Sequence, residues 1–238
     1  MIAVTDIVLA IIPARGGSKG LPRKNMKVFN GQPLIFWTIQ AALASRCITH
    51  VVVTSDDDEV LDFAKGCGVE PLKRPAGLAE DHSSMIPVIS HSLKSIEDSG
   101  IAPDYCVLLQ PTSPLRRSHH IDAAFDLVME KKAAAGISVI ERSSGAAKWF
   151  LEKDGYMKGL VDNEAPFQQR QNLPRVLSAN GAIYIVKCDF FSQNLSLLPD
   201  CTVPYLMERE DSIDIDTIDE FLKAEGLFSG SLFNSAKS

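Results

Sequence analysis

The stretch Ile7-Val-Leu-Ala-Ile-Ile-Pro13, followed directly by Ala14-Arg-Gly-Gly-Ser-Lys-Gly-Leu-Pro-Arg-Lys-Asn25, decides the kind of fold and site to expect. Its first part is an apolar run with the length of a buried strand. Its second part contains paired glycines, and the segment from Arg15 to Lys27 holds five basic residues and no acid. Fixed cations and the backbone N–H groups that glycines leave accessible bind phosphates. The stretch therefore predicts a strand that ends in a phosphate-binding loop. A merely solvated basic loop is the alternative, and the glycines count against it.

Two later runs, Val51–Thr54 and Tyr105–Gln110, have the apolar and β-branched composition of strands buried on both faces. Helical patterns precede, separate and follow them, at Pro33–Ser45, Asp57–Cys67, Ile86–Asp98 and Ile121–Lys131. Strands that alternate with helices predict an α/β protein with a doubly wound, mostly parallel sheet. Ligands of such sheets bind beyond the carboxyl ends of the strands, which is where the basic loop should lie.

The chain has 238 residues, a length that favours one domain with a sizeable core. We expect this domain to span residues 1–228, and the glycine- and serine-rich residues 229–238 to form a flexible tail. Residues 140–180 do not continue the alternation of apolar strands and amphipathic helices. Within them, Lys148–Lys158 predicts a β-hairpin whose turn is Asp154-Gly155, so we expect an insertion on the α/β core.

The predicted hairpin would expose three aromatic side chains on a monomer: Trp149, Phe150 and Tyr156. Clustered exposed aromatic residues are typical of a subunit contact. We therefore expect a homodimer that forms through this insertion, and the alternative is a hairpin folded against its own core.

The formal net charge is −6, so the basic loop is a local exception on an acidic protein. This balance argues against long nucleic acid as a partner and favours a small polyanion. The five cysteines form no CxxC pair, which favours free thiols in a reducing compartment. No segment has the features of a membrane span or a secretory signal, and we expect a cytoplasmic protein without membrane contact.

The loop lacks the GxxxxGK[ST] spacing of a Walker A motif and the GxGxxG fingerprint of dinucleotide sites. Instead, IPARGGSKGLPRKN resembles the signature of the CMP-sialic acid synthetases, the cytidylyltransferases that activate nonulosonic acids with CTP. Further segments occur in that family's order: Lys73-Arg-Pro75, Leu109-Gln-Pro-Thr-Ser-Pro-Leu-Arg116, Arg170-Gln-Asn-Leu-Pro174, Asn180-Gly-Ala-Ile-Tyr184 and Ser212-Ile-Asp-Ile-Asp216. The resemblance covers nearly the whole chain and implies a Rossmann-like nucleotidyltransferase fold.

The resemblance implies a nucleotide site made of Ala14, Arg15, Ser18, Lys24, Asn25, Arg74 and Ser83. Arg15 and Lys24 would neutralise the triphosphate, and Ser18 would add a hydroxyl donor. Asn25 and Arg74 would recognise the cytosine and the ribose. Asn25 as a turn cap and Ser83 as the N-cap of the next helix are the alternatives.

A sugar site is implied at Gln110, Thr112, Ser113, Arg170, Asn180, Tyr184, Phe190 and Phe191. The glutamine and threonine would hold the acceptor, and Arg170 would grip its carboxylate, because a guanidinium binds a carboxylate through two parallel hydrogen bonds. Phe190 and Phe191 would face an N-acyl group, with core packing as the alternative.

Asp214 and Asp216 are two residues apart, so on a strand they would share one face while isoleucines occupy the other. Their place in the family's pattern implies a Mg²⁺ site, since this cation prefers carboxylate oxygens beside substrate phosphates. A solvated acidic face or a helix cap is the alternative.

The implied reaction is transfer of CMP from CTP to the anomeric hydroxyl of N-acetylneuraminate, with release of pyrophosphate. Its catalytic residues would be Arg15, Lys24, Gln110, Asp214 and Asp216. Outside the two carboxylates of the metal site, no histidine or carboxylate is an evident general base. Legionaminate or another bacterial nonulosonate is the alternative acceptor, and an inactive nucleotide-binding module is a third hypothesis.

Overall fold

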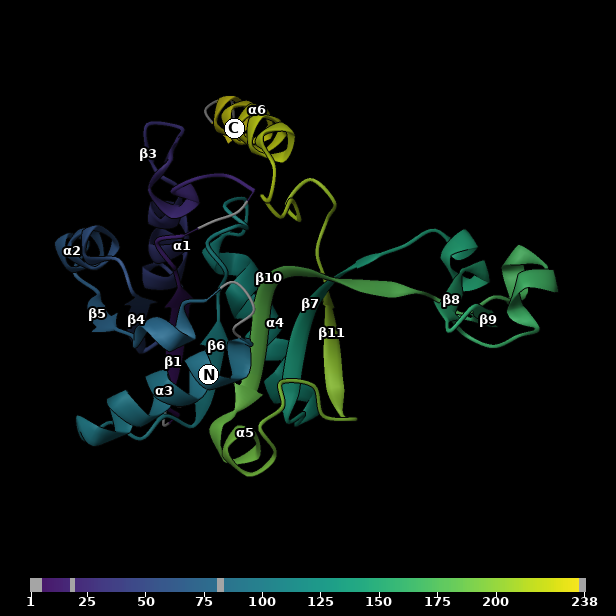
Figure 1. The fold of residues 1–238 in the computed structure, drawn as a ribbon, viewed down its shortest axis with the longest axis horizontal. Helices are drawn as coiled ribbons and strands as arrows, with labels where there is room; N and C mark the ends of the chain where they lie inside the picture. Colours follow the sequence, from purple (N-terminus) through teal and green to yellow (C-terminus); the bar gives the residue numbers. More distant parts are fainter. Residues whose placement is uncertain (1–5, 18–19, 81–83, 236–238) are drawn as a thin grey trace.

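The computed structural model describes residues 6–17, 20–80 and 84–235 and has a central sheet with helices on both faces (Figure 1). The sheet order is β11-β7-β10-β6-β1-β4-β5. Its strands are β1 (Val8–Pro13), β4 (His50–Ser55), β5 (Glu70–Lys73), β6 (Tyr105–Leu108), β7 (Ala135–Glu141), β10 (Leu177–Lys187) and β11 (Thr202–Leu206). Only β10 runs antiparallel to its neighbours in this sheet, so the predicted mostly parallel α/β fold is confirmed.

Strand β1 lies in the middle of the sheet, and its side chains alternate between two apolar layers. Val8, Ala10 and Ile12 pack on the face covered by α1 (Leu34–Leu43), α2 (Asp58–Gly66) and α4 (Ser118–Lys131). Leu9 and Ile11 pack on the opposite face, under α3 (Met85–Asp98) and α5 (Cys188–Asn194). Burial on both faces explains why the sequence of β1 is continuously apolar.

The helices begin where local capping allows. Helix α2 starts after Asp57, whose side chain accepts a hydrogen bond from the Glu59 backbone N–H at 2.9 Å. Helix α4 starts at Ser118, three residues before the predicted start. The reason is a cap that the apolar pattern does not show, because His120 Nδ1 accepts a hydrogen bond from the Arg117 backbone N–H at 3.1 Å.

Residues between β7 and β10 form an extension that projects away from the body of the molecule (Figure 1). It contains the predicted hairpin, β8 (Phe150–Lys153) and β9 (Tyr156–Gly159), and the short 3₁₀ helices η3 (Ser144–Lys148), η4 (Ala165–Phe167) and η5 (Arg170–Asn172). The hairpin turn is confirmed, since Asp154 and Gly155 both have positive φ, at 54° and 81°.

Helix α6 (Ile218–Ser235) packs on the body beside the short strands β2 (Val28–Phe29) and β3 (Gln32–Pro33). Phe29 lies at the centre of an aromatic cluster, with ring centroids 5.4 Å from Phe221 and 5.5 Å from Phe228. This packing holds the first part of helix α6, through Phe228, against the body of the molecule.

Candidate active site

The phosphate loop and the Gln110 loop follow β1 and β6, two adjacent parallel strands, and their carboxyl ends border one cavity of about 270 Å³. The short helices η1 (Lys24–Met26) and η2 (Ala76–Leu78) lie on its rim. The predicted residues that line it are Arg15, Lys24, Asn25, Arg74, Gln110 and Thr112. The topology therefore brings the predicted phosphate, base and acceptor groups to the same edge of the sheet.

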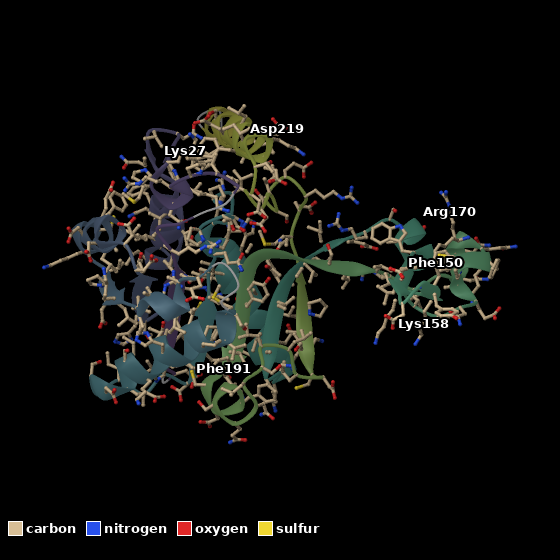
Figure 2. The ribbon with its side chains drawn as sticks, in the orientation of Figure 1. Lys27, Phe150, Lys158, Arg170, Phe191 and Asp219 are labelled. Carbon is tan, nitrogen blue, oxygen red and sulfur yellow. The ribbon has the colours of Figure 1, made fainter. Side chains whose placement is uncertain are left out.

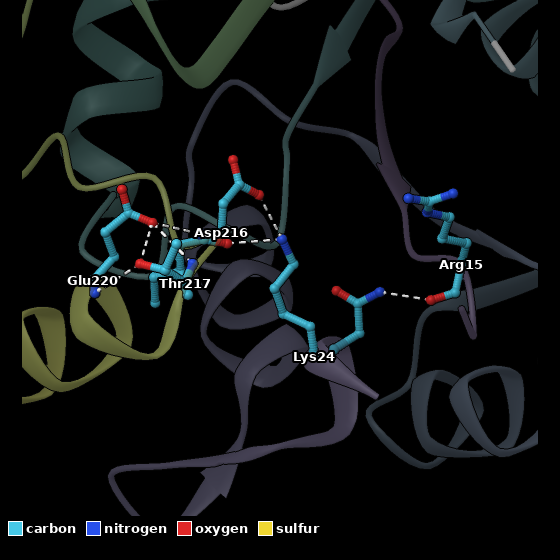
Figure 3. Close-up of polar contacts among 7 residues, drawn as sticks. Arg15, Lys24, Asp216, Thr217 and Glu220 are labelled. Atoms are coloured by element: carbon cyan, nitrogen blue, oxygen red, sulfur yellow. Dashed lines mark hydrogen bonds and ion pairs between the residues drawn. The ribbon is translucent and has the colours of Figure 1, made fainter. Parts of the chain in front are cut away.

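Asn25 is buried, and its side-chain Nδ2 donates to the carbonyl oxygen of Arg15 at 2.9 Å. This bond closes the phosphate loop on itself, so Asn25 both lines the cavity and holds the backbone of Arg15 (Figure 3). The Gly16 backbone N–H donates to Asp56 Oδ1 at 3.1 Å, which fixes the start of the loop from the side of β4. The side-chain bond of Asn25 is thus a local structural one, as in the turn-capping alternative, while recognition of cytosine and ribose stays a prediction.

Lys24 joins the phosphate loop to the predicted metal segment, which lies about 190 residues later in the chain. Its Nζ donates to the Ile215 carbonyl at 2.7 Å and to Asp216 Oδ1 at 2.8 Å (Figure 3). Gly20 marks a second point of close approach, because a Cβ atom there would lie 2.2 Å from the Asp216 carbonyl oxygen. The two segments are therefore packed together at the backbone level.

Asp214 and Asp216 lie in an extended segment outside the sheet, whereas the sequence placed them on a strand. A backbone hydrogen bond from Ile215 N–H to Thr112 O, 2.8 Å long, fixes this segment on the Gln110 loop. Ile215 is fully buried in the aromatic cluster and Asp216 is exposed, whereas Asp214 is partly buried, so the two carboxylates differ in exposure. The geometry of the pair thus comes from packing of the isoleucine rather than from a β-ladder.

The Asp214 carboxyl group is the more buried of the two. Burial raises its pKa, the Thr112 hydroxyl hydrogen bond lowers it, and the negative charge of Asp216 raises it further. Its Oδ1 atom is buried without a hydrogen-bond partner among the described residues. A buried carboxylate oxygen that lacks a donor, next to a second carboxylate, fits a hard cation such as Mg²⁺. The described residues contain no group of three or more His, Cys, Asp or Glu that could hold a metal ion, so any cation here would need substrate or water oxygens as well.

Gly181 lies close to both the Gln110 side chain and the Asp214 carboxylate. A Cβ atom at this position would lie 3.1 Å from Asp214 Oδ2 and 3.2 Å from Gln110 Oε1, and the residue has φ +79°. It sits in an irregular part of β10, where the pairing with β7 shifts between Ala179 and Tyr184. The irregularity therefore opens space between the predicted acceptor glutamine and the predicted metal carboxylate.

Arg116 had no role in the sequence analysis, although it ends the quoted Leu109–Arg116 motif. Its guanidinium is fully buried, and Nη1 donates to the carbonyls of Gln110 at 3.1 Å and Ala182 at 3.0 Å. Burial lowers its pKa to about 9. It ties the Gln110 loop to β10, and its signal in the sequence is an arginine that ends the proline-containing loop Gln110–Arg116.

Arg74 is also buried, and its Nη2 lies 3.8 Å from Asp56 Oδ1. Burial lowers its pKa, the Asp56 charge acts against this, and Arg15 adds to the lowering. Three apolar side chains that the sequence interpretation omitted share this part of the cavity: Leu78, Met85 and Val88. A cation beside an apolar wall suits a flat polar ring such as a nucleobase.

Several predicted sugar residues do not open to the cavity. Asn180 is buried. Its Oδ1 atom accepts a hydrogen bond from Ser138 Oγ at 2.6 Å, and its Nδ2 atom donates one to Ser212 Oγ at 2.9 Å. Ser113 is fully buried inside its own loop. Tyr184 is half-buried, and its pKa is raised first by burial and then by the charge of Asp214, so it lies near that carboxylate.

Phe190 and Phe191 require a correction, because the structure places them in α5, near the opposite end of the sheet. Phe191 is fully buried in the apolar layer under β1, and Phe190 packs against the same layer. Figure 2 shows Phe191 at the end of the body opposite Lys27 and Asp219. The core-packing alternative is therefore the one observed.

Arg170 lies on the extension, apart from the cavity of its own chain (Figure 2). Ser18 and Ser83, predicted for the nucleotide site, lie outside the described residues. Ala14 is buried at the end of β1, where its N–H donates to the Thr54 carbonyl at 3.0 Å.

A cationic, glycine-containing loop after the central strand, joined through Lys24 to a segment with two carboxylates, defines a nucleotide-binding α/β protein of the phosphoryl-transfer class. The sequence model of a family described as "Cytidylyltransferase" matches residues 9–213. The chain therefore belongs to the cytidylyltransferase family.

Individual relatives refine this assignment. The chain is 32% identical over 222 residues to the N-acylneuraminate cytidylyltransferase of Streptococcus agalactiae serotype III, covering 92% of this chain and 52% of that protein. It is 33% identical to the CMP-N,N'-diacetyllegionaminic acid synthase of Legionella pneumophila, covering 88% of this chain and 91% of the relative. The chain thus spans about half the length of the N-acylneuraminate enzymes that it matches.

Solved structures support the fold. The CMP:2-keto-3-deoxy-manno-octonic acid synthetase complexed with CTP has a TM-score of 0.70 at 19% identity, over 94% of this chain and 99% of that chain. No helix in the described part of the chain combines the length and the apolar character that a membrane span requires.

Proposed function

We propose that this chain transfers CMP from CTP to the anomeric hydroxyl of N-acetylneuraminate and releases pyrophosphate. The names of its relatives support a nonulosonic acid as acceptor. The observation that carries the proposal is the contact of Lys24 with Asp216, which sets the phosphate loop against the paired carboxylates beside Gln110 and Thr112. Legionaminate or another bacterial nonulosonate is the alternative acceptor, which the Legionella relative supports equally.

In this reaction the anomeric oxygen forms a bond to the α-phosphorus, the bond to the β-phosphate bridging oxygen breaks, and the hydroxyl proton is lost to solvent. Arg15 and Lys24 would stabilise the charge that develops on the leaving pyrophosphate. Gln110 would accept or donate a hydrogen bond to the acceptor and hold its hydroxyl in line. Arg74 and Asn25 would bind the cytosine and ribose end of the cavity.

Asp214 and Asp216 would hold Mg²⁺, a role that the buried, unpartnered Oδ1 atom of Asp214 supports. When bound, the ion would supply positive charge to the phosphate oxygens. Asp216, which accepts a hydrogen bond from Lys24 Nζ, would be one of the two ligands of the ion, and Lys24 would bind phosphate oxygens of CTP.

We propose further that the protein is a homodimer through the extension. The exposed apolar side chains there support this: Trp149, Phe150, Leu151, Tyr156, Met157 and Phe167. An isolated two-stranded hairpin has little stability of its own, which also favours a partner surface. In a dimer, Arg170 would serve the site of the partner subunit.

The cytoplasm is the proposed location, since all five cysteines are free thiols.

The first test is pyrophosphate release from CTP and Mg²⁺ with N-acetylneuraminate, legionaminate or pseudaminate as acceptor, read as kcat/KM. We expect CTP-dependent release with at least one of the three and the highest kcat/KM with N-acetylneuraminate. No release with any of them would favour the inactive nucleotide-binding module.

The second test is Asp216→Ala. Because the side chain of Asp216 is largely exposed, the variant should fold normally, while CMP-sugar formation should be lost, by about three orders of magnitude or more. Turnover close to that of the unmodified protein, with an unchanged urea unfolding midpoint, would contradict the assignment of Asp216 as a metal ligand.

A further inference from the structure

Arg116 ends the Gln110 loop and folds back on it. Two backbone hydrogen bonds close the loop, from the Ser113 N–H to the Gln110 carbonyl at 3.4 Å and from the Arg116 N–H to the Ser113 carbonyl at 3.2 Å. These turns bring the guanidinium back to the first residue of the loop, where Nη1 donates to the Gln110 carbonyl at 3.1 Å. The same atom donates to the Ala182 carbonyl of β10 at 3.0 Å. One nitrogen atom therefore fixes the start of the loop against β10.

The bonds of Arg116 lie beside the place where Gln110 and Asp214 come close to each other. Gly181 directly precedes Ala182 in β10. A Cβ atom added to Gly181 would lie 3.2 Å from Gln110 Oε1 and 3.1 Å from Asp214 Oδ2. A shift of the Gln110 backbone relative to β10 would therefore change the gap between the glutamine side chain and the carboxylate.

The buried guanidinium is not neutralised by a carboxylate. Arg116 is 1% exposed and forms no ion pair with any residue that the structure describes, and its Nε and Nη2 atoms are buried without a hydrogen-bond partner there. A buried cation without a counter-charge costs free energy. Nearby, a neutral amide forms comparable links, since Asn180 bonds to both Ser138 and Ser212. Arg116 is therefore a costly way to stabilise the fold, which favours a role in placing the loop.

The nucleotide half of the site has separate anchors. The Asn25 side chain holds the Arg15 carbonyl at 2.9 Å, and the Gly16 N–H donates to a carboxylate that follows β4. Neither contact involves the Gln110 loop, and Arg116 is not among the residues that line the nucleotide cavity. A change at Arg116 should therefore affect the acceptor side of the site more than the phosphate loop.

We propose that Arg116 is a positioning residue for the acceptor: its bonds to the Gln110 and Ala182 carbonyls hold the Gln110 side chain at the distance from Asp214 that the reaction requires. This inference rests on the nucleotidyl transfer proposed above. Arg116 acts through Gln110 and contacts neither substrate.

The experiment compares Arg116→Met, which keeps a long side chain but removes all N–H donors, with Arg116→Lys. The acceptor is the sugar acid that the unmodified protein turns over, N-acetylneuraminate or legionaminate. In Arg116→Met its kcat/KM should fall by about 100-fold, the cost of a displacement of about 1 Å, while the Kd for CTP by calorimetry stays within about threefold. Arg116→Lys retains a charged donor and should recover about tenfold of the loss.

Ile96→Ala is the matched control for a general loss of stability. Ile96 is 1% exposed in the last turn of α3 and is not among the residues that line the nucleotide cavity. The variant should lower the urea unfolding midpoint, because it leaves a void in the core, and keep the acceptor kcat/KM within about twofold.

Three outcomes would overturn the inference: an unchanged acceptor kcat/KM in Arg116→Met, an equal loss of CTP affinity, or an equal kinetic loss in Ile96→Ala. If Arg116→Met shows no cooperative urea transition, Arg116→Lys decides. A lower acceptor kcat/KM at unchanged Kd for CTP then supports the inference, and an unchanged acceptor kcat/KM overturns it. Failure of the proposed function is seen separately, because the unmodified protein would then release no pyrophosphate with any acceptor.

Discussion

At the level of single residues, one glycine controls how closely the two loops of the site approach each other. Gly20→Ala would place a Cβ atom 2.2 Å from the Asp216 carbonyl, so the backbone of the carboxylate segment must move. Because a displacement of about 1 Å can cost a factor of about 100 in rate, we expect kcat/KM to fall by roughly that factor. Steady-state kinetics checks this.

Gly66→Ala is the control for that variant, since no atom lies within 4 Å of the added methyl group and its φ is not positive. It should leave kcat/KM unchanged. Similar kinetics for the two alanine variants would contradict the idea that the phosphate loop and the Asp214–Asp216 segment are packed together at Gly20.

The buried His120 makes the free energy of unfolding depend on pH. Burial, with the nearby charges of His119, Arg117 and Arg116, lowers its pKa to about 4, although Nε2 lies 3.5 Å from Asp211 Oδ2. The unfolded chain therefore binds a proton between pH 6.5 and about 4 that the folded chain does not. As pH falls through this window, the free energy of unfolding should drop by up to about 3 kcal/mol.

Urea unfolding of the unmodified protein and of His120→Gln at pH 7.5 and pH 4.5 tests this. Glutamine can still accept the Arg117 N–H bond at the start of α4, and it does not titrate. The variant should lose about 2 kcal/mol less than the unmodified protein between the two pH values. Equal losses would show that other groups cause the acid sensitivity.

At the level of elements, the extension should decide the oligomeric state. Trp149 and Phe167 are 56% and 84% exposed, and replacing both by serine removes a large part of the apolar surface proposed as the dimer contact. We expect the unmodified protein to be a dimer by light scattering and the double variant to be a monomer at micromolar concentration.

Val28→Ser serves as the control, because Val28 is 63% exposed on β2, in the body of the molecule. It should remain a dimer. A monomeric unmodified protein at assay concentration would refute the dimer, and a double variant that stays dimeric would move the contact away from the extension.

At the level of the whole molecule, helix α6 fixes the Asp214–Asp216 segment, because the helix begins directly after that segment and packs on the body. Phe221 is buried against Phe29, and α6 begins two residues after Asp216. Phe221→Ala should lower the free energy of unfolding by about 3–4 kcal/mol, the cost of removing a buried aromatic ring. Urea titration would measure this change.

Leu222→Ala is the matched control, since the neighbouring Leu222 is 58% exposed, and we expect a change within about 0.5 kcal/mol. Loss of packing by α6 should also release the Asp214–Asp216 segment, so kcat should fall in Phe221→Ala but not in Leu222→Ala. Full activity in a strongly destabilised Phe221→Ala variant would show that α6 stabilises the fold without controlling the position of the Asp214–Asp216 segment.

The layers of the fold could be predicted from the amino-acid sequence alone, and so could a cationic loop after the central strand. The apolar run of β1 and the helical periodicities are local signals, and the cations of the phosphate loop lie next to each other in the chain. Contiguous motifs that resemble those of a known family led us to predict Arg15, Lys24, Gln110 and Asp214 as site residues.

Only the tertiary structure decided how distant segments combine. A phenylalanine suits both a sugar-binding site and an apolar core, and only the position of α5 in the structure shows that Phe191 packs in the core. Arg116 became a candidate positioning residue because the Gln110 loop packs against β10, where the buried guanidinium donates to the Ala182 carbonyl. The physical reason is that burial and charge compensation depend on which segments pack together, and contacts between residues far apart in the chain leave no periodic signal in the sequence.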